Sequence, residues 1–379
     1  MKKTRRHIAL AIGLVSVFGL VASACGDDAS DTASDDSTET TAAGATETTA
    51  AAATGLDIDY SSLTGSLNGT GASFQDALQQ TVKGEFEKEA TGLKVNYAKS
   101  GSSAGKADLA GNIVQFAGTD SLIKDADKAT FTGGEVLYFP IAAAPITISY
   151  NLAGVEDLKL SADVIAGIFQ SEITSWDDEA IAADNPDATL PAEPIAVVHR
   201  SDGSGTTSNF TKYLKKASPS VWKLDSGDTV EWPATTQGAE KNSGVATLIT
   251  STEGSIGYVD LADSVSANLS RALVKNSSGE FVEAKLPGAS AALAGAEIAD
   301  DLTYDPLNAA GADAYPITAP TWVIVYKTQT DQAVADALKG YLNFFLTTGQ
   351  ELAPTVGYAP LPAELQKKAI AQLDLITVG

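Results

Sequence analysis

Cysteine, histidine and basic residues are scarce in this chain, and each scarcity excludes a class of protein. The 379 residues include one cysteine, Cys25, so no intrachain disulfide can form. The chain has only two histidines in addition to this cysteine, so it offers no spaced Cys/His set of the kind that binds zinc. Acidic residues outnumber basic ones by 48 to 25, and the net charge is −23. So acidic a chain argues against nucleic acid or anionic lipid headgroups as partners.

The first 24 residues are expected to be a secretory signal peptide. A basic start is followed by an apolar run from Ile8 to Val21 and by the small residues Ala22-Ser23-Ala24. The run is too short to span a bilayer as a mature helix, and its flanks are those of a cleaved leader. Thr4-Arg5-Arg6 leaves twin-arginine export open beside general secretion. Cleavage would remove four basic residues and no acidic one, leaving a net charge of −27.

Cys25 stands where bacterial lipoproteins carry an acylated cysteine. The segment before it resembles a lipobox, although Ala22 replaces the usual Leu or Val, and an ordinary cleavage site is the alternative. Residues 26–55 contain no Lys, Arg or aromatic residue and consist largely of Ala, Thr, Ser, Asp and Glu. Such a segment cannot bury enough apolar surface to offset its ordering entropy. We therefore expect residue 25 to be a lipidated cysteine and the residues up to 55 to be a disordered linker. Composition alone does not establish whether this linker is glycosylated.

From Leu56 onward, short apolar runs alternate with amphipathic ones. This alternation predicts an α/β architecture with largely parallel sheets. Ser161 is the expected N-cap of a helix that continues to Phe169. The expected strands are 67–70, 94–97, 113–117, 136–150, 194–199 and 320–326, and the other expected helices are 74–90, 100–111, 201–216 and 330–347.

Three loops rich in Gly, Ser and Thr each follow an expected strand and open an expected helix. They cover residues 68–74, 100–105 and 201–207. Helix N-termini expose unpaired N–H groups at the positive end of the dipole, glycine allows close approach, and hydroxyls add donors. One such loop is commonly just a capped turn, but three together indicate an oxyanion site. None ends in the Gly-Lys-Ser/Thr of a Walker loop, and none has the pattern of a nucleophile elbow.

Two acidic residues refine this prediction. Arg200 precedes the third loop and Asp202 lies inside it, so the carboxylate can hold the guanidinium fork toward an oxyanion, unless the two form only a surface pair. Asp120 follows the expected strand 113–117 and is either a helix N-cap or an acceptor for a protonated ligand. Phosphate near neutral pH keeps a proton and sulfate keeps none. A carboxylate facing the ligand therefore favours phosphate.

These motifs resemble the phosphate-binding proteins of bacterial Pst-type ABC importers. The similarity lies in Gly71-Ala72-Ser73-Phe74, Ser100-Gly101-Ser102-Ser103, Phe116-Ala117-Gly118-Thr119-Asp120 and, most specifically, residues 200–206. Shorter matches lie at residues 173–177, 254–259 and 315–317, so the resemblance covers most of the folded part. The second loop departs most from the family, because its later glycines are thinned to Ala104-Gly105.

The resemblance implies a two-lobed periplasmic-binding-protein-like fold of type II, in which two crossing hinge strands join the lobes and the ligand lies in the cleft between them. Residues 56–144 and 315–379 would form a discontinuous lobe I, and residues 145–314 would form lobe II. The implied phosphate contacts are Ser73, Phe74 (through its N–H), Ser102, Asp120, Arg200, Asp202, Ser204, Gly205 and Thr206.

The function implied is capture of inorganic phosphate, without catalysis, metal or cofactor, by a protein lipid-anchored on the outer face of the cytoplasmic membrane. Its partners would be phosphate and the permease subunits of an ABC importer. Two alternatives are a secreted phosphatase and a binding protein for another solute. The first is disfavoured because Ser204 has no evident general base and His199, beside Arg200, reads as structural. The second is disfavoured because Asp120 would penalise a fully deprotonated anion.

Overall fold

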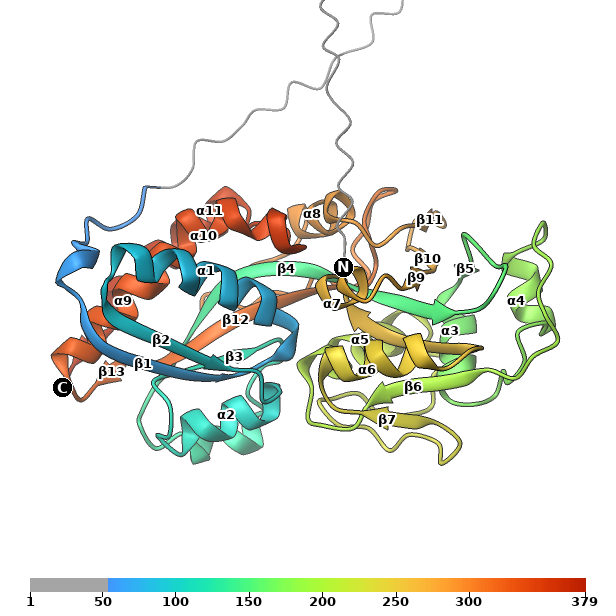
Figure 1. Ribbon diagram of the computed structural model, residues 1–379, viewed down its shortest axis with the longest axis horizontal. Coiled ribbons are helices and arrows are strands. Elements are labelled where there is room, and N and C mark those ends of the chain that lie inside the picture. Colours follow the sequence, from blue (N-terminus) through green and yellow to red (C-terminus); the bar gives the residue numbers. More distant parts are fainter. Residues whose placement is uncertain (1–53) are drawn as a thin grey trace, which may run out of the picture. The chain divides into compact units, whose positions relative to one another are not determined.

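Two long strands, β4 (Val136–Asn151) and β12 (Thr318–Tyr326), run through the middle of the fold. The first part of β4, from Val136 to Pro145, pairs antiparallel with β12. The remainder, from Ile146 to Asn151, pairs antiparallel with β8 (Ser255–Asp260). One continuous strand therefore joins two portions of the sheet (Figure 1). The computed structural model describes residues 54–379, so the predicted signal peptide, Cys25 and the linker up to residue 53 lie outside the described residues.

Within residues 54–379 the main sheet has nine strands, in the order β2-β1-β3-β12-β4-β8-β6-β7, with β9 also paired to β4. The bounds not yet given are β1 (Thr64–Gly71), β2 (Gly92–Ala98), β3 (Phe116–Thr119), β6 (Ala196–Arg200), β7 (Gln237–Ala239) and β9 (Ser270–Arg271). Pairing is parallel among β1, β2 and β3 and among β6, β7 and β8. The predicted α/β class is confirmed, but the strands around β4 and β12 are antiparallel, which gives a mixed sheet.

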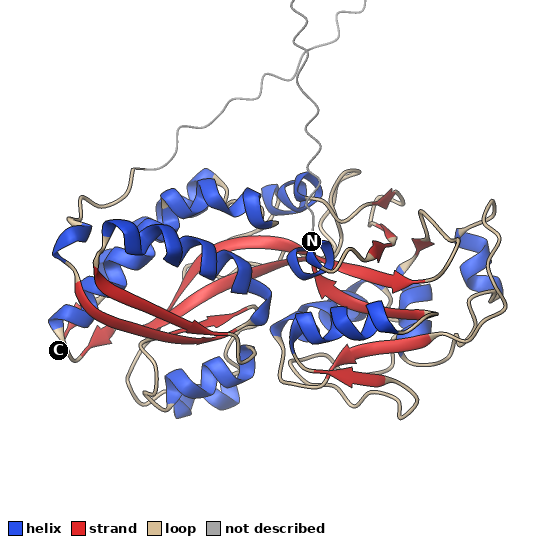
Figure 2. Cartoon of the chain, in the orientation of Figure 1, coloured by secondary structure: helices blue, strands red, loops and turns tan. Residues whose placement is uncertain are grey.

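Helices cover this sheet in two groups, which define two lobes (Figures 1 and 2). Lobe I contains β1–β3, and its helices are α1 (Asp76–Glu89), α2 (Ser102–Ala110), α9 (Gln332–Leu346), α10 (Thr348–Leu352) and α11 (Ala363–Gln372). Lobe II contains β6–β8, and its helices are α3 (Ala162–Phe169), α4 (Glu179–Asp184), α5 (Gly205–Ala217) and α6 (Lys241–Ser251). Two further helices, α7 (Leu261–Ser266) and α8 (Leu286–Ala294), lie near β4. The predicted division at residues 144/145 and 314/315 stays a prediction.

Small sheets and 3-10 turns complete the described structure. The small strands are β5 (Lys159–Leu160), β10 (Leu273–Lys275) and β11 (Phe281–Val282) in one sheet, and β13 (Thr328–Gln329) and β14 (Thr377–Val378) in another. The 3-10 turns are η1 (Tyr60–Ser62), η2 (Ser73–Gln75), η3 (Asp125–Thr130), η4 (Ala353–Val356) and η5 (Leu373–Leu375). None of the described helices is both long and apolar enough to cross a bilayer.

The burial of single elements follows their sequence pattern. β2 alternates strictly between exposed and buried residues, as expected of a strand with one face on the core. α9 buries its aromatic side against α1, where the ring centroids of Tyr341 and Phe344 lie 5.3 and 5.4 Å from that of Phe86. These clustered rings bury large apolar areas and hold the C-terminal helices onto lobe I.

Some local predictions need correction. The strand expected at 113–117 begins only at Phe116, because Asn112 has a left-handed φ of 54° and leaves Ile113 68% exposed in a turn. Ser161 does precede α3, but its side chain makes no capping hydrogen bond. Two prolines lie inside β4: the register with β12 shifts beside Pro140, and Pro145 ends the pairing with β12. Bulges and strand ends are where a sheet tolerates proline.

Candidate functional site

The three Gly/Ser/Thr loops lie against one another in the folded chain, at the boundary between the lobes. The Gly101 N–H donates to the Gly71 carbonyl at 2.7 Å, which joins the first two loops. The Ser103 N–H donates to the Gly203 carbonyl at 3.2 Å, which joins the second loop to the third. Gly101 has a φ of 98°, and a Cβ there would lie 2.9 Å from the Asp202 carboxylate. The local sequence therefore permits a close approach that a larger residue would prevent.

The N-terminus of α5 in lobe II lies at this boundary. Ser204 is its N-cap, and the Ser204 Oγ accepts a hydrogen bond from the Thr207 N–H at 3.1 Å. A Cβ on Gly205 would lie 2.6 Å from the Ser102 Oγ and 2.9 Å from the Asp120 backbone nitrogen. The first amides of a helix have no partner inside it, so α5 directs unpaired N–H groups and its positive dipole end toward lobe I.

Arg200 and Asp202 form a buried bidentate ion pair. The Arg200 Nε and Nη2 donate to the two carboxylate oxygens of Asp202 at 2.7 and 2.6 Å. Burial alone would raise the pKa of Asp202, but the Arg200 hydrogen bonds hold it below its usual value. The alternative of a surface pair is thereby excluded for Arg200, whose side chain is 1% exposed. A guanidinium has five N–H donors, so Asp202 fixes its orientation and leaves other donors for an anion.

Asp120 is buried, 2% exposed, in lobe I opposite the N-terminus of α5. Its Oδ1 accepts a hydrogen bond from the Thr321 Oγ1 at 2.6 Å, whereas its Oδ2 has only the long 3.5 Å contact with the Ser102 Oγ. Burial raises the pKa of Asp120 to about 7, against the lowering effects of Thr321 and Arg200. The next helical element, η3, begins only at Asp125 with Lys124 as its N-cap, so the N-cap alternative for Asp120 is wrong. The residue is a buried acid that changes charge near neutral pH.

The predicted site residues of lobe I and lobe II are brought together by a residue that the sequence analysis missed. Asn242, fully buried at the start of α6, contacts both lobes. Its backbone N–H donates to the Ser73 Oγ at 3.2 Å, and its side-chain amide donates to the Thr206 Oγ1 at 3.2 Å. Its side-chain oxygen accepts from the Arg200 Nη1 at 3.4 Å. No motif marks Asn242, because its importance comes from contacts with segments distant in sequence.

Phe74 can contribute to the candidate site only through its backbone. Its ring is fully buried and packs edge-on against Tyr358, whose hydroxyl donates to the Phe74 carbonyl at 2.5 Å. These contacts fix the turn η2, whose first N–H groups have no partner within a helix.

All the predicted site residues lie around one region between the lobes. They are Ser73, Phe74, Ser102, Asp120, Arg200, Asp202, Ser204, Gly205 and Thr206.

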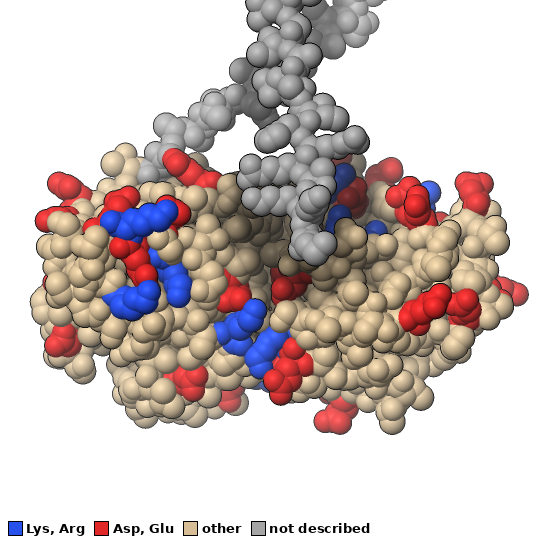
Figure 3. Space-filling model, in the orientation of Figure 1, with Lys and Arg blue, Asp and Glu red and all other residues tan. Residues whose placement is uncertain are grey.

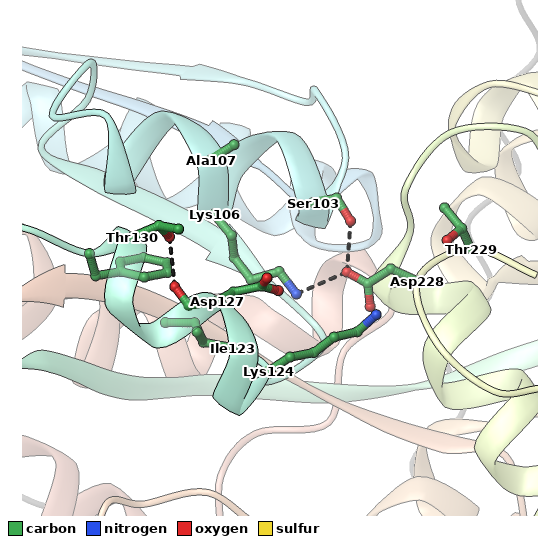
Figure 4. A pocket seen from close by; sticks show the side chains of 10 residues that line it. Ser103, Lys106, Ala107, Ile123, Lys124, Asp127, Thr130, Asp228 and Thr229 are labelled. Atoms are coloured by element: carbon green, nitrogen blue, oxygen red, sulfur yellow. Dashed lines mark hydrogen bonds and ion pairs between the residues drawn. The ribbon is translucent and has the colours of Figure 1, made fainter.

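A second missed group lies beside this region. Asp228 of lobe II accepts hydrogen bonds from two residues of α2, the Lys106 Nζ at 2.9 Å and the Ser103 Oγ at 2.8 Å (Figure 4). Burial acts to raise the pKa of Asp228, but the charge of Lys106 brings it below its usual value. This ion pair borders a cavity of about 250 Å³ that Lys124 and Asp127 also line.

His199 contacts an aromatic ring and a backbone carbonyl group. Its ring stacks on Trp232, with centroids 4.9 Å apart, and its Nδ1 contacts the Arg200 carbonyl oxygen at 3.0 Å. Burial lowers the pKa of this imidazole. Between residues 54 and 379, no group of three or more His, Cys, Asp or Glu residues is arranged to hold a metal ion.

Comparison with known proteins connects this geometry to a family. The sequence model of the PBP superfamily domain matches residues 31–348. The phosphate-binding protein PstS of Xylella fastidiosa is 35% identical over 308 residues, covering 80% of this chain and 83% of the relative. The phosphate-binding protein PstS 3 of Mycobacterium tuberculosis is 32% identical over 376 residues, covering 97% and 98%.

Solved structures show the same fold. A high-affinity periplasmic phosphate-binding protein (PfluDING) bound with phosphate superposes with a TM-score of 0.68 at 23% identity, covering 81% of this chain and 94% of that one. A substrate-binding protein of a putative phosphate ABC transporter from Clostridium perfringens, with bound phosphate, gives 0.59 at 17% identity, covering 79% and 100%. The two-lobed fold predicted from the resemblance is confirmed. The chain belongs to the PBP superfamily and, within it, to the family of Pst-type phosphate-binding proteins.

Proposed function

We propose that this protein captures inorganic phosphate outside the cytoplasmic membrane and delivers it to the permease subunits of an ABC importer. One observation carries the proposal: the buried acid Asp120 faces helix N-termini and the neighbouring Arg200–Asp202 pair, all at the boundary between two lobes. The names of the relatives, which are phosphate-binding proteins, support the same ligand.

In this proposal the anion is held by hydrogen bonds alone. The donors are the hydroxyls of Ser73, Ser102, Ser204 and Thr206, the backbone N–H groups of Phe74, Gly205 and Thr206, and the Arg200 guanidinium. Asp202 holds the guanidinium in place. Asp120 accepts the hydrogen bond from the P–OH group. Because a fully deprotonated anion such as sulfate has no proton to offer, the ionised carboxylate repels it.

The energies are sufficient despite the acidic surface, which Figure 3 shows on the face in view. Exposed charges are largely screened beyond about 8–10 Å at physiological salt. A charge-assisted hydrogen bond contributes about 1.5–3 kcal/mol net. A handful therefore supplies the roughly 8 kcal/mol of micromolar binding, and the remaining bonds offset desolvation and lobe closure. The net charge of the chain slows encounter without preventing capture.

The tether is part of the proposal. Acylated Cys25 would anchor the mature protein on the outer face of the cytoplasmic membrane, and the linker that follows would space the binding lobes from it. Both segments lie outside the described residues apart from Thr54 and Gly55.

Binding without catalysis is the favoured activity. The Ser204 side chain caps the N-terminus of α5, and His199 stacks on Trp232. His199 is therefore not placed to act as a general base for Ser204. Release of colour from a chromogenic phosphoester by the purified protein would instead support a phosphatase.

Titration calorimetry on residues 54–379 tests the ligand, because the helices, strands and buried core of the described structure lie within this segment. We expect phosphate binding at micromolar concentration or tighter, and much weaker sulfate binding at pH 8. Tight sulfate binding, or no heat with micromolar phosphate, would contradict the proposal.

A further inference from the structure

The ion pair between Lys106 and Asp228 joins the two lobes beside the proposed phosphate site. Lys106 lies on α2 of lobe I, whereas Asp228 lies in lobe II between α5 and β7. The side chains are 13% and 8% exposed, so most of this ion pair is removed from solvent. The Lys106 Nζ also donates to the Ser121 Oγ at 2.8 Å, which fixes it within lobe I.

Asp228 is coupled to the binding loop through its backbone as well as its carboxylate. Its carbonyl oxygen accepts the Ser204 N–H at 2.9 Å, directly at the N-cap of α5. Its carboxylate receives the hydrogen bonds of Lys106 and Ser103. One residue thus ties the N-terminus of α5 to α2, and this connection can form only when the lobes are together.

Neither Lys106 nor Asp228 is among the groups proposed to touch phosphate, and their charges act on the pKa of Asp120 in opposite directions. Arg200 is already neutralised by Asp202, and Asp120 receives the Thr321 hydroxyl. Lys106 and Asp228 neutralise each other, so they add no net charge to the site. In the open protein the charges of Lys106 and Asp228 are hydrated. The pair contributes the free energy gained when the lobes close and bring these two charges together.

We infer that Lys106 and Asp228, with Ser103, form a latch that holds the lobes closed over the bound anion and sets its rate of release. The inference rests on the proposed function for the identity of the anion. Breaking a buried, hydrogen-bonded charge pair acts mainly on dissociation. The latch therefore predicts faster release with little change in the association rate.

Lys106→Met and Asp228→Asn remove one charge each and keep the approximate size of the side chain. We expect each to raise the phosphate dissociation rate by at least about tenfold in stopped-flow measurements, since removal of one partner leaves the other charge buried and unpaired. The double variant should be less impaired than the product of the two single effects, because both remove the same interaction.

Lys124→Met is the matched control. Lys124 lines the same cavity, and among residues 54–379 it forms no ion pair within 4.0 Å. Its dissociation rate should equal that of the unaltered protein. Dissociation rates of Lys106→Met and Asp228→Asn within twofold of the unaltered protein, or equal effects of all three variants, would overturn the latch.

A ligand-independent measurement separates this inference from the proposed function. Residues 54–379 contain no cysteine, so Ile113→Cys in lobe I and Ala234→Cys in lobe II, both exposed, can carry a fluorescent donor and acceptor. Without phosphate, Lys106→Met should shift the energy-transfer distribution toward more separated lobes, and Lys124→Met should not. If the unaltered protein fails to bind phosphate while this shift occurs, the proposed ligand is wrong and the latch stands. An unchanged distribution together with unchanged release rates removes the latch alone.

Discussion

At the scale of single residues, we expect the carboxyl group of Asp120 to decide which oxyanion the proposed site accepts. Burial raises its pKa to about 7, so the group is mostly ionised at pH 8 and mostly protonated at pH 6. The ionised form accepts a hydrogen bond from a P–OH group and repels a bare oxygen. The protonated form can donate a hydrogen bond to a bare oxygen.

Sulfate binding should therefore depend on pH through Asp120. Sulfate itself does not titrate in this range, so its affinity should rise as pH falls through 7, by about tenfold between pH 8 and pH 6. In Asp120→Asn the amide donates at every pH, so sulfate should bind more tightly and with little pH dependence. Calorimetry with sulfate at pH 8, 7 and 6 measures both effects.

Arsenate offers a useful comparison in the same titrations. It is protonated like phosphate, so it should compete with phosphate in the unaltered protein.

Asp125→Asn is the matched control for Asp120→Asn, because Asp125 is fully exposed and its carboxylate pairs with Lys128. Continued exclusion of sulfate by Asp120→Asn would show that another group sets the selectivity.

At the scale of elements, the N-terminus of α5 must approach lobe I closely. Gly205 lies so near Ser102 and Asp120 that a methyl group would contact the Asp120 Cβ at 2.8 Å. The neighbouring atoms include the backbone of Asp120, which cannot move aside as a flexible side chain does. Glycine is therefore required here by packing between lobes, and not by the helix that it begins.

Gly205→Ala separates these two effects. Alanine is the better helix former, so the ligand-free protein should unfold at the same or a slightly higher temperature. Phosphate affinity should fall by at least about tenfold, because the added methyl group keeps the lobes from closing fully. Thermal unfolding and calorimetry measure the two quantities on the same sample.

Gly84→Ala provides the control within α1. A Cβ at Gly84 meets no atom within 4 Å, and the residue is exposed. This variant should gain up to about 1 kcal/mol of stability and bind phosphate normally. Normal phosphate affinity in Gly205→Ala would show that the lobes do not need the approach seen between α5 and Asp120.

At the scale of the whole molecule, β4 is the strand shared by both lobes, because it pairs with β12 on one side and with β8 on the other. Next to where β4 exchanges β12 for β8, the Ile146 N–H donates to the Ile317 carbonyl at 2.8 Å. The contacts that Asn242 and Asp228 make between the lobes are polar. Polar contacts beside a shared strand suit closure by a hinge.

We expect phosphate to shift the molecule toward the closed form. Small-angle X-ray scattering on residues 54–379 should give a smaller radius of gyration with saturating phosphate than without it, and no change with sulfate at pH 8. Asn242→Ala should reduce the difference, since it removes the side-chain hydrogen bond to Ser73 of lobe I together with those to Thr206 and Arg200 of lobe II. An identical scattering curve with and without bound phosphate would rule out ligand-driven closure.

Local sequence was a good guide wherever short-range chemistry decides the structure. The loop from Arg200 to Thr206 contains its own ion pair, its own N-cap and its own glycine, so its shape is determined within a few residues. The alternation of β2 and the aromatic face of α9 likewise follow from periodicity. The family resemblance rested on these local motifs, and the comparisons confirmed the family and the fold.

Only the tertiary structure decided which distant groups meet. Asn242, Lys106, Asp228 and Thr321 carry no motif, and each matters because the closed lobes bring it against a loop from elsewhere in the chain. The pKa of Asp120 is likewise a product of burial, which no short segment of sequence specifies. The sequence by itself determined a set of candidate oxyanion-binding loops, because hydroxyls, glycines and helix starts are local. Their assembly into one region around a buried acid depends on packing between lobes, which is long-range.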